Sequence, residues 1–129
     1  MVYVIYQNRI TYIFTYILRK MIKTNQEISK LMKVMQSMED FDMVEFVLLH
    51  GSSAEGRATE NSDIDVCVYF KGNSEEQSRF RLRLLEKLPS DIDVQIFQQL
   101  PLYVRKEVLK GREIYVHDRE FTYDLALQN

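Results

Sequence analysis

The sequence predicts an α/β (α+β) domain in which a short mixed β-sheet carries a site at one edge and helices pack on its other side. Three β-rich apolar runs alternate with segments of helical periodicity, which is the pattern of a sheet covered by helices. A chain of 129 residues that is 46% hydrophobic and 28% charged is long enough for one folded core. Two of the β-rich runs also begin with alternating aspartates, which would place pairs of carboxylates on one strand face.

Residues 1–20 form an atypical N-terminal segment, and residues 21–129 are predicted to form the single domain. The segment is rich in tyrosine and isoleucine, which favours a strand or an apolar segment that contacts another surface. Gln7, Asn8 and Arg9 interrupt it well below the roughly 20 apolar residues of a membrane span, and it does not follow the secretory-signal pattern. Two explanations stay open: translation starts at Met21, or the segment forms an extra strand or an oligomer contact.

The rest of the chain alternates between helical and strand-like patterns. The predicted elements are a helix over 24–38, strands over 43–49 and 63–70, a helix over 74–88, a strand over 91–97, a helix over 101–110, a strand over 113–116 and a helix over 119–127. Thr24 and Glu27 have the spacing of a capping box for the first helix. Asn73 or Ser74 is expected to cap the second, and Gly111 to end the third.

The second predicted helix has an apolar face and a basic stripe. Arg79, Arg83 and Lys87 follow one another at intervals of four residues, so they lie on one side of the helix. Glu75 is placed to pair with Arg79, which favours a solvated, salt-bridged face over a dock for an acidic partner.

The stretch between the first two predicted strands contains the candidate phosphate-binding and metal-binding residues. Gly51 and Ser52 form a turn after the first strand, and backbone N–H groups exposed by such a turn suit phosphate oxygens. Asp63 and Asp65 begin the second strand two residues apart, so their carboxylates point to one face. Carboxylates placed together repel each other unless a cation lies between them, and Mg²⁺ commonly takes one or two carboxylates plus substrate phosphates. This layout predicts a nucleotidyl-transfer site.

Simpler explanations of the same residues are less satisfactory. The stretch from Gly51 is a near miss to a P-loop, but Arg57 replaces the lysine and Ala58 replaces the metal-binding hydroxyl. An ordinary Gly/Ser-rich loop would not explain why two aspartates enter an apolar strand as a pair. His50 and His117 are the only histidines, so a histidine metal site or a Ser-His-Asp relay has little support.

The spacing of Gly-Ser, ten residues and then Asp-x-Asp resembles the nucleotidyltransferase superfamily related to DNA polymerase β. The short chain is most similar to minimal nucleotidyltransferases, which include the MNT-type antitoxins of HEPN/MNT toxin–antitoxin pairs. The likeness covers residues 43–118. One departure is that Glu55 stands where family members often have an arginine, which affects a phosphate role for that position but not the metal site.

The resemblance implies a nucleotidyltransferase fold and Mg²⁺-dependent transfer of AMP from ATP. Asp63 and Asp65 would ligate Mg²⁺, while Gly51 and Ser52 would hold the phosphates. A third carboxylate on the neighbouring strand joins the pair in the superfamily, and this role falls on Asp93, completing a position for a second Mg²⁺.

The acceptor is expected to be a protein hydroxyl, most simply a tyrosine of a partner HEPN toxin, because the catalytic unit uses most of the chain. The net charge of −2 predicts no general nucleic-acid binding, and no membrane partner is expected. Cys67 is the single cysteine, so it is expected to be a core residue of a cytoplasmic protein. The alternatives are a non-catalytic antitoxin that acts by complex formation, or an antibiotic nucleotidyltransferase that works as a homo-oligomer.

Overall fold

The computed structural model describes the backbone of residues 2–51 and 64–128 and the side chains of residues 11–51 and 64–128. Four strands form one mixed sheet in the order β3-β2-β1-β4. β1 (Val44–His50) pairs antiparallel with β2 (Ile64–Phe70) and β4 (Arg112–Val116), and β2 pairs parallel with β3 (Ile92–Ile96). The predicted mixed sheet is confirmed, and each strand begins and ends within one residue of its prediction.

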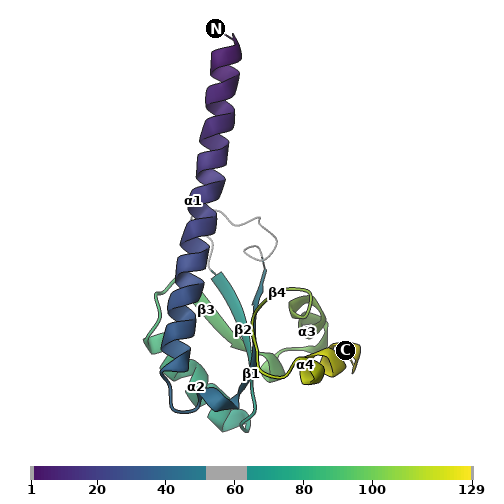
Figure 1. Cartoon of the computed structure of the whole chain (residues 1–129). Coiled ribbons are helices and arrows are strands. Elements are labelled where there is room, and N and C mark those ends of the chain that lie inside the picture. Colours follow the sequence, from purple (N-terminus) through teal and green to yellow (C-terminus); the bar gives the residue numbers. More distant parts are fainter. Residues whose placement is uncertain (1, 52–63, 129) are drawn as a thin grey trace.

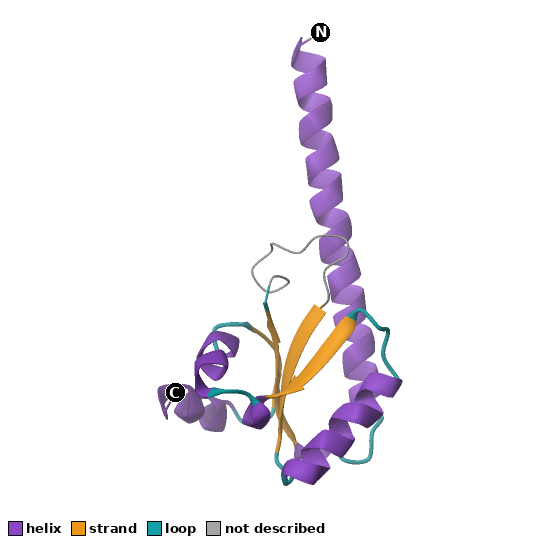
Figure 2. Cartoon of the chain, turned by 180° about the vertical axis from the view of Figure 1, so that it is seen from behind, coloured by secondary structure: helices purple, strands orange, loops and turns teal. Residues whose placement is uncertain are grey.

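Two long helices cover one face of this sheet. α1 (Val2–Gln36) and α2 (Ser74–Glu86) lie on the same side in both views (Figures 1 and 2). Leu31 of α1 and Leu84 of α2 are fully buried in a cluster with Val66 and Val94 of the central strands. This face holds the larger of the two apolar clusters, and it stiffens the strands on which the predicted carboxylates lie.

Two shorter helices lie on the opposite face. α3 (Leu102–Val108) and α4 (Arg119–Gln128) pack there against a second cluster that contains Phe46, Leu48 and Phe97. The prediction of helices opposite the site holds for α1 and α2, while α3 and α4 add a cover on the other face. The physical reason is that β1 presents apolar side chains to both faces, so both must be shielded from water.

Residues 2–20 of the N-terminal segment are helical, so the extra strand, one of the explanations left open for this segment, does not form there. α1 runs without a break through Thr24, which therefore does not begin a helix as its capping-box spacing predicted. The strand preference of tyrosine and isoleucine depends on a neighbouring strand to pack against, and a helix forms here instead. No helix in the described part of the chain is long and apolar enough to cross a membrane.

The helix that follows β2 begins as predicted. The Asn73 side chain accepts a hydrogen bond from the Glu76 N–H at 2.9 Å, and the Glu76 side chain accepts one from the Asn73 N–H at 3.0 Å. This reciprocal capping box satisfies two of the N–H groups left open at a helix start. The expected surface pair is also present, with Arg79 3.6 Å from Glu75.

The C-terminal part of the chain contains one glycine whose role differs from its prediction. Gly111 does not adopt the left-handed backbone of a helix stop, since Gly51 is the only described residue with positive φ. A Cβ at Gly111 would instead lie 2.2 Å from the carbonyl oxygen of Leu49. Glycine is therefore required because the chain passes against β1 as it enters β4.

α1 passes the end of the sheet at which β2 and β3 begin. Lys23 lies 3.9 Å from Asp91, and the backbone carbonyl of Asp91 accepts a hydrogen bond from the Ile64 N–H at 2.8 Å. Burial, a hydrogen bond with Asp91 and repulsion by its charge raise the pKa of Glu27, and Lys23 opposes this shift. One oxygen of Glu27 is buried without a hydrogen-bond partner among the described residues.

Removal of residues 1–20 is predicted to leave the domain folded and able to bind ATP. The first buried side chain of α1 in the described part is Ile28, so the deleted turns contribute little to the core. The melting temperature should change by less than about 4 °C, and an ATP titration should be unaffected. An insoluble or unfolded product would show that the segment belongs to the core.

Glu27→Gln is predicted to raise stability at neutral pH. Folding raises the pKa of the Glu27 carboxyl, so the protein loses stability as the pH rises from the unfolded-state pKa through the folded-state pKa. The uncharged amide of glutamine does not titrate and therefore avoids this loss. The melting temperature should rise by roughly 1–3 °C at pH 7. The gain should vanish near pH 3, where the carboxyl is protonated in both states. The exposed residue Glu39 provides the control through Glu39→Gln, and equal effects of both substitutions would refute the explanation.

Candidate functional site

Two of the predicted site residues lie side by side on neighbouring strands. Asp65 of β2 and Asp93 of β3 are register partners in the parallel pair. Strands in a sheet lie about 4.8 Å apart, so the two carboxylates begin from adjacent backbone positions. Both alternate with residues of the larger cluster, Val66 and Val94, and therefore point to the face that α1 and α2 leave open.

The end of β1 brings the predicted phosphate turn to the same place. His50 is the register partner of Asp65, and Gly51 follows it with a φ of 73°. A Cβ at Gly51 would lie 2.6 Å from Oδ2 of Asp65, so the carboxylate lies against the glycine backbone. Both observations explain why this position requires glycine: its backbone is left-handed and a side chain has no room. A phosphate held at this turn would therefore be close to Asp65.

Two of the five predicted site residues lie outside the described residues. These are Ser52 and Asp63, and Glu55, the departure from the family pattern, lies there too. Among the described residues, His, Cys, Asp and Glu side chains form no group of three that could hold a metal ion. Gly51, Asp65 and Asp93 are thus the predicted residues that the described part of the chain brings together.

Asp93 has two neighbours that sequence patterns did not identify. The Gln95 side chain donates a hydrogen bond to Asp93 at 3.0 Å. Arg81 of α2 donates from Nε to the carbonyl oxygen of Val94 at 2.6 Å, and its terminal nitrogen lies 3.9 Å from the other Asp93 oxygen. Arg81 can do this because β3 is an edge strand, whose outer backbone groups are open to side chains. It lies outside the predicted basic stripe, so helical periodicity carried no signal for it.

His50 is a neutral neighbour of the aspartates. Burial lowers its pKa, although the nearby charges of Asp65 and Asp93 act in the opposite direction. Its Nε2 atom is buried and has no hydrogen-bond partner among the described residues. A neutral imidazole in this position can donate or accept one hydrogen bond but cannot neutralise the carboxylates.

Cys67 is a core residue, as the sequence predicted. It lies one strand repeat beyond Asp65 on the same face and packs in the second apolar cluster with Phe46 and Leu48. Burial raises the pKa of its thiol to about 12, so the sulfur stays protonated and unreactive at neutral pH.

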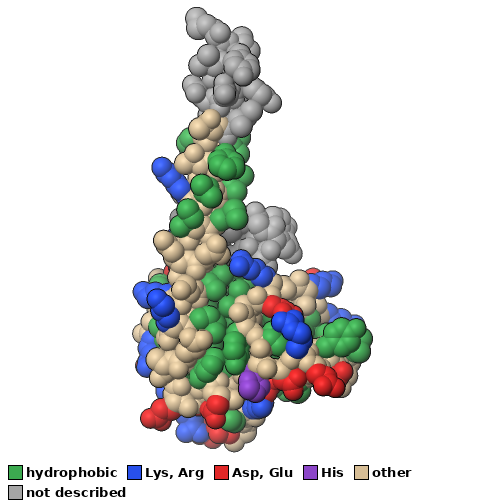
Figure 3. All heavy atoms as spheres, in the orientation of Figure 1, with side chains coloured by type: hydrophobic (Ala, Val, Ile, Leu, Met, Phe, Trp, Pro, Cys, Tyr) green, Lys and Arg blue, Asp and Glu red, His purple; other side chains and the backbone are tan. Residues whose placement is uncertain are grey.

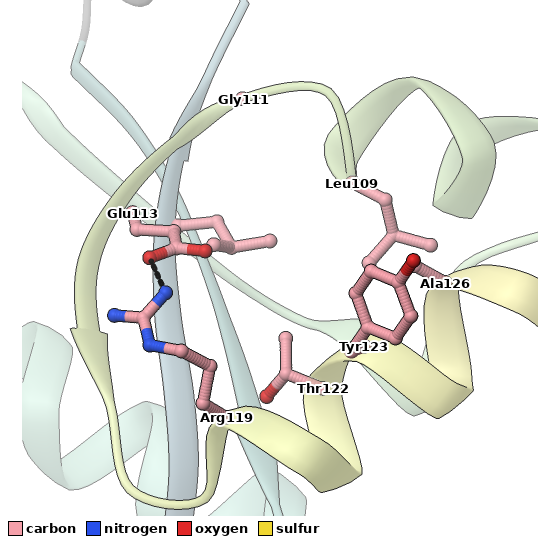
Figure 4. A pocket seen from close by; sticks show the side chains of 8 residues that line it. Leu109, Gly111, Glu113, Arg119, Thr122, Tyr123 and Ala126 are labelled. Carbon is pink, nitrogen blue, oxygen red and sulfur yellow. Dashed lines mark hydrogen bonds and ion pairs between the residues drawn. The ribbon is translucent and has the colours of Figure 1, made fainter.

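A separate cavity of about 230 Å³ lies between β4, α3 and α4 (Figure 4). Arg119 and Glu113 form an ion pair of 2.9 Å at its wall, and the Tyr123 ring lies across from them. The residues that line it are Leu48, Leu109, Gly111, Glu113, Arg119, Thr122, Tyr123 and Ala126. Neither Asp65 nor Asp93 is among them, so the cavity is not the space in front of the carboxylate pair.

A family model and a curated protein both match the sequence of this chain. The model of the polymerase beta nucleotidyltransferase family matches residues 30–120. A putative protein adenylyltransferase from Methanocaldococcus jannaschii is 35% identical over 72 residues. The aligned region is 56% of this chain and 55% of that protein, so the chain spans about half the length of this relative.

Solved structures share the fold. A toxin–antitoxin structure with AMP-PNP matches with a TM-score of 0.62 and 19% identity, over 78% of this chain and 82% of that one. A chain of the complex between the tri-AMPylated HEPN toxin and the MNT antitoxin of Shewanella oneidensis matches with a TM-score of 0.57 and 16% identity, over 81% of both chains. At these identities the structures establish the architecture only. Because the family model covers most of the chain, the protein belongs to the polymerase beta nucleotidyltransferase family.

Proposed function

We propose that this protein transfers AMP from ATP to a hydroxyl group of a partner protein, most specifically a tyrosine of a HEPN toxin, and so acts as an antitoxin. The observation that carries the proposal is the position of the Asp65 carboxylate, between the Gly51 turn on one side and Asp93 on the other. A nucleotidyltransferase needs a phosphate-binding turn and metal-binding carboxylates at this separation, because the metal must contact the phosphates.

The residues present fit a divalent metal. Asp65 and Asp93 offer hard oxygen ligands from one sheet face, and Asp63, outside the described residues, is the proposed third ligand. Mg²⁺, when bound, would neutralise phosphate charge and help to activate the acceptor oxygen. We assign the triphosphate to the backbone at Gly51 and Ser52.

The chain itself contributes position and charge rather than a covalent intermediate. Gly51 has no side chain to obstruct the approach of a phosphate to Asp65. The Asp93 side chain is 40% exposed and reachable from solvent, and we assign to it the acceptance of the proton from the incoming hydroxyl. The apolar clusters on both faces hold the two strands in register, and this alignment is what phosphoryl-transfer sites chiefly require.

Three findings support ATP and a protein acceptor. The Methanocaldococcus jannaschii relative is named as a protein adenylyltransferase, one structure of the same fold holds AMP-PNP, and another contains an AMPylated HEPN toxin with its antitoxin. The cavity beside α4 is lined by neither carboxylate, so it is not assigned to the acceptor. A cytoplasmic setting, where ATP is available, completes the proposal.

The decisive experiment is AMP transfer to a candidate HEPN toxin, for which the product of a neighbouring gene is the first choice. Incubation with ATP and Mg²⁺ should add about 329 Da per AMP to the HEPN protein, by the balance ATP + R–OH → R–O–AMP + pyrophosphate. Intact mass and peptide mapping should locate the addition on a tyrosine. Asp65→Ala and Asp63→Ala should reduce the rate by a factor of about 10³ or more without a change of fold. Binding of the HEPN protein without any transfer would support the non-catalytic alternative, and modification of RNA or a small molecule alone would refute the protein acceptor.

Arg81 is proposed to position Asp93 rather than to touch the nucleotide. It is anchored to the Val94 carbonyl, and its charge lies beside the carboxylate that would meet the acceptor. Residues that orient metal ligands typically contribute a factor of 10 to 100 in activity or metal affinity.

Arg81→Ala is accordingly predicted to lower kcat for AMP transfer about tenfold and to leave the KM for ATP within about twofold. Arg81→Lys should recover part of the loss. Arg79→Ala is the matched control, because Arg79 is on the same helix and pairs with Glu75 at the surface. An unchanged rate in Arg81→Ala, or an equal loss of rate in Arg79→Ala, would show that Arg81 does not position Asp93.

A further inference from the structure

The cavity between β4, α3 and α4 lies beside the carboxylate site and can be reached from solvent. Its volume is about 230 Å³, and Figure 3 shows charged and apolar side chains side by side over the region of α3 and α4. Tyr123 is 67% exposed and the Arg119 side chain is 76% exposed, so the wall that these two residues form is open to solutes. Ligand sites combine apolar walls with a few polar groups, and this cavity has both.

The cavity and the Asp65 carboxylate share one face of the sheet. Leu48 lines the cavity and precedes His50 by two residues, so the two side chains point to the same face. His50 is the register partner of Asp65, and Gly51 follows His50. The Cα atoms of Leu48 and Asp65 are therefore about 8 Å apart, from about 6.6 Å along the strands and about 4.8 Å between them. A ribose and a base extend over a comparable length, so a nucleotide whose phosphates lie at Gly51 can reach the cavity.

The volume of the cavity limits what it can hold. Pockets for whole drug-sized ligands enclose about 300–1,000 Å³, and this cavity is smaller. At about 30 Å³ per water molecule, its volume corresponds to about eight waters. One fused ring system fits such a space, whereas a complete nucleoside triphosphate does not. The ribose and phosphates of a bound nucleotide would lie outside the cavity, toward Gly51.

The lining residues suit a purine base that carries an amino group. Tyr123 presents an aromatic ring across the cavity from Glu113 and Arg119 (Figure 4), and bases stack on such rings. Arg119 donates a hydrogen bond to Oε2 of Glu113 at 2.9 Å, so this wall presents an acceptor and a donor side by side. A carboxylate can accept about four hydrogen bonds, which leaves Glu113 able to accept another. One edge of adenine presents the matching pair, the 6-amino donor beside the N7 acceptor.

We propose that this cavity is the subsite for the adenine base of ATP. Tyr123 stacks on the base, Glu113 accepts a hydrogen bond from the 6-amino group, and Arg119 donates one to N7. The inference rests on the proposed function, because it places the triphosphate at Gly51. It gives the protein a means of selecting ATP, since guanine has an oxygen in place of the amino group, and this oxygen would face the Glu113 carboxylate. Nucleotide binding alone can test it, without an acceptor.

The first test obstructs the cavity in the full-length protein. Ala126→Trp places a large ring at a residue that lines the cavity, whereas Leu127→Trp places the same ring on the next residue of α4, which is 71% exposed and is not a lining residue. In calorimetric titrations with Mg²⁺, Ala126→Trp should raise the Kd of ATP at least about tenfold and leave the Kd of tripolyphosphate within about twofold. Leu127→Trp should change both constants by less than about twofold. An unchanged ATP affinity in Ala126→Trp, or an equal loss for both ligands, would overturn the inference.

The second test removes the proposed hydrogen bond from either side. Purine riboside triphosphate is ATP without the 6-amino group, and Glu113→Ala removes the proposed acceptor. The wild-type protein should bind ATP at least about tenfold more tightly than this analogue, and in Glu113→Ala the two affinities should agree within about twofold. Glu107→Ala is the matched control, because Glu107 pairs with Lys110 at the surface of the same region, and it should keep the preference. A preference that persists in Glu113→Ala, or that is absent from the wild-type protein, would contradict the assignment of the base to this wall.

The outcomes keep this inference separate from the proposed function. If the variants change ATP binding as expected but the HEPN protein is never modified, the base subsite stands and the protein acceptor fails. If AMP is transferred to the HEPN protein with an unchanged KM for ATP in Ala126→Trp, the proposed function stands and the base subsite fails. Equal affinities of the wild-type protein for ATP and tripolyphosphate would also overturn the inference, because the base would then contribute nothing to binding.

Discussion

The in-register parallel pairing of β2 with β3 is the constraint on which the candidate site depends. Asp65 and Asp93 occupy equivalent positions in the two strands, so their carboxylates can act together. A slip of one residue would turn one aspartate to the opposite face, because side chains alternate along a strand. The larger apolar cluster prevents the slip, since Val66 and Val94 would then leave the core. Burial on one face of the sheet thus determines the chemistry on the other.

The same pairing creates an electrostatic conflict that the surrounding residues reduce. Carboxylates that start from register positions on adjacent strands, about 4.8 Å apart, repel each other when both are charged. Arg81 places a positive charge beside Asp93, and the Gln95 side chain donates a hydrogen bond to it. A divalent cation would offset the repulsion further, which couples metal binding to the stability of this sheet end. The neutral His50 adds no charge of its own to this balance.

α1 has a buried part and an exposed part along one continuous apolar stripe. Over its second half, apolar residues at helical spacing pack on the sheet, and Leu31 and Met35 are fully buried. Over residues 11–22, the same periodicity continues and large apolar side chains are exposed. Helix formation by the first half is favoured because the second half is already held by tertiary packing, so each added residue extends an existing helix. The apolar character that resembled a strand in the sequence therefore appears as an exposed helical surface.

The sequence by itself determined the strands, the capped helix at Asn73 and the candidate residues Gly51 and Asp65, since turn chemistry and alternation are local properties. The choice of Asp93 as a third carboxylate came from the family resemblance of the same sequence. Only the tertiary structure decided the contacts of Arg81, the close approach that requires Gly111 and the helical state of residues 2–20. Arg81 acts on an edge-strand carbonyl and Gly111 passes the backbone of a distant strand, so neither role leaves a periodic signal. The N-terminal segment differs because strand formation needs a partner, and whether one exists is settled by the packing of the whole chain.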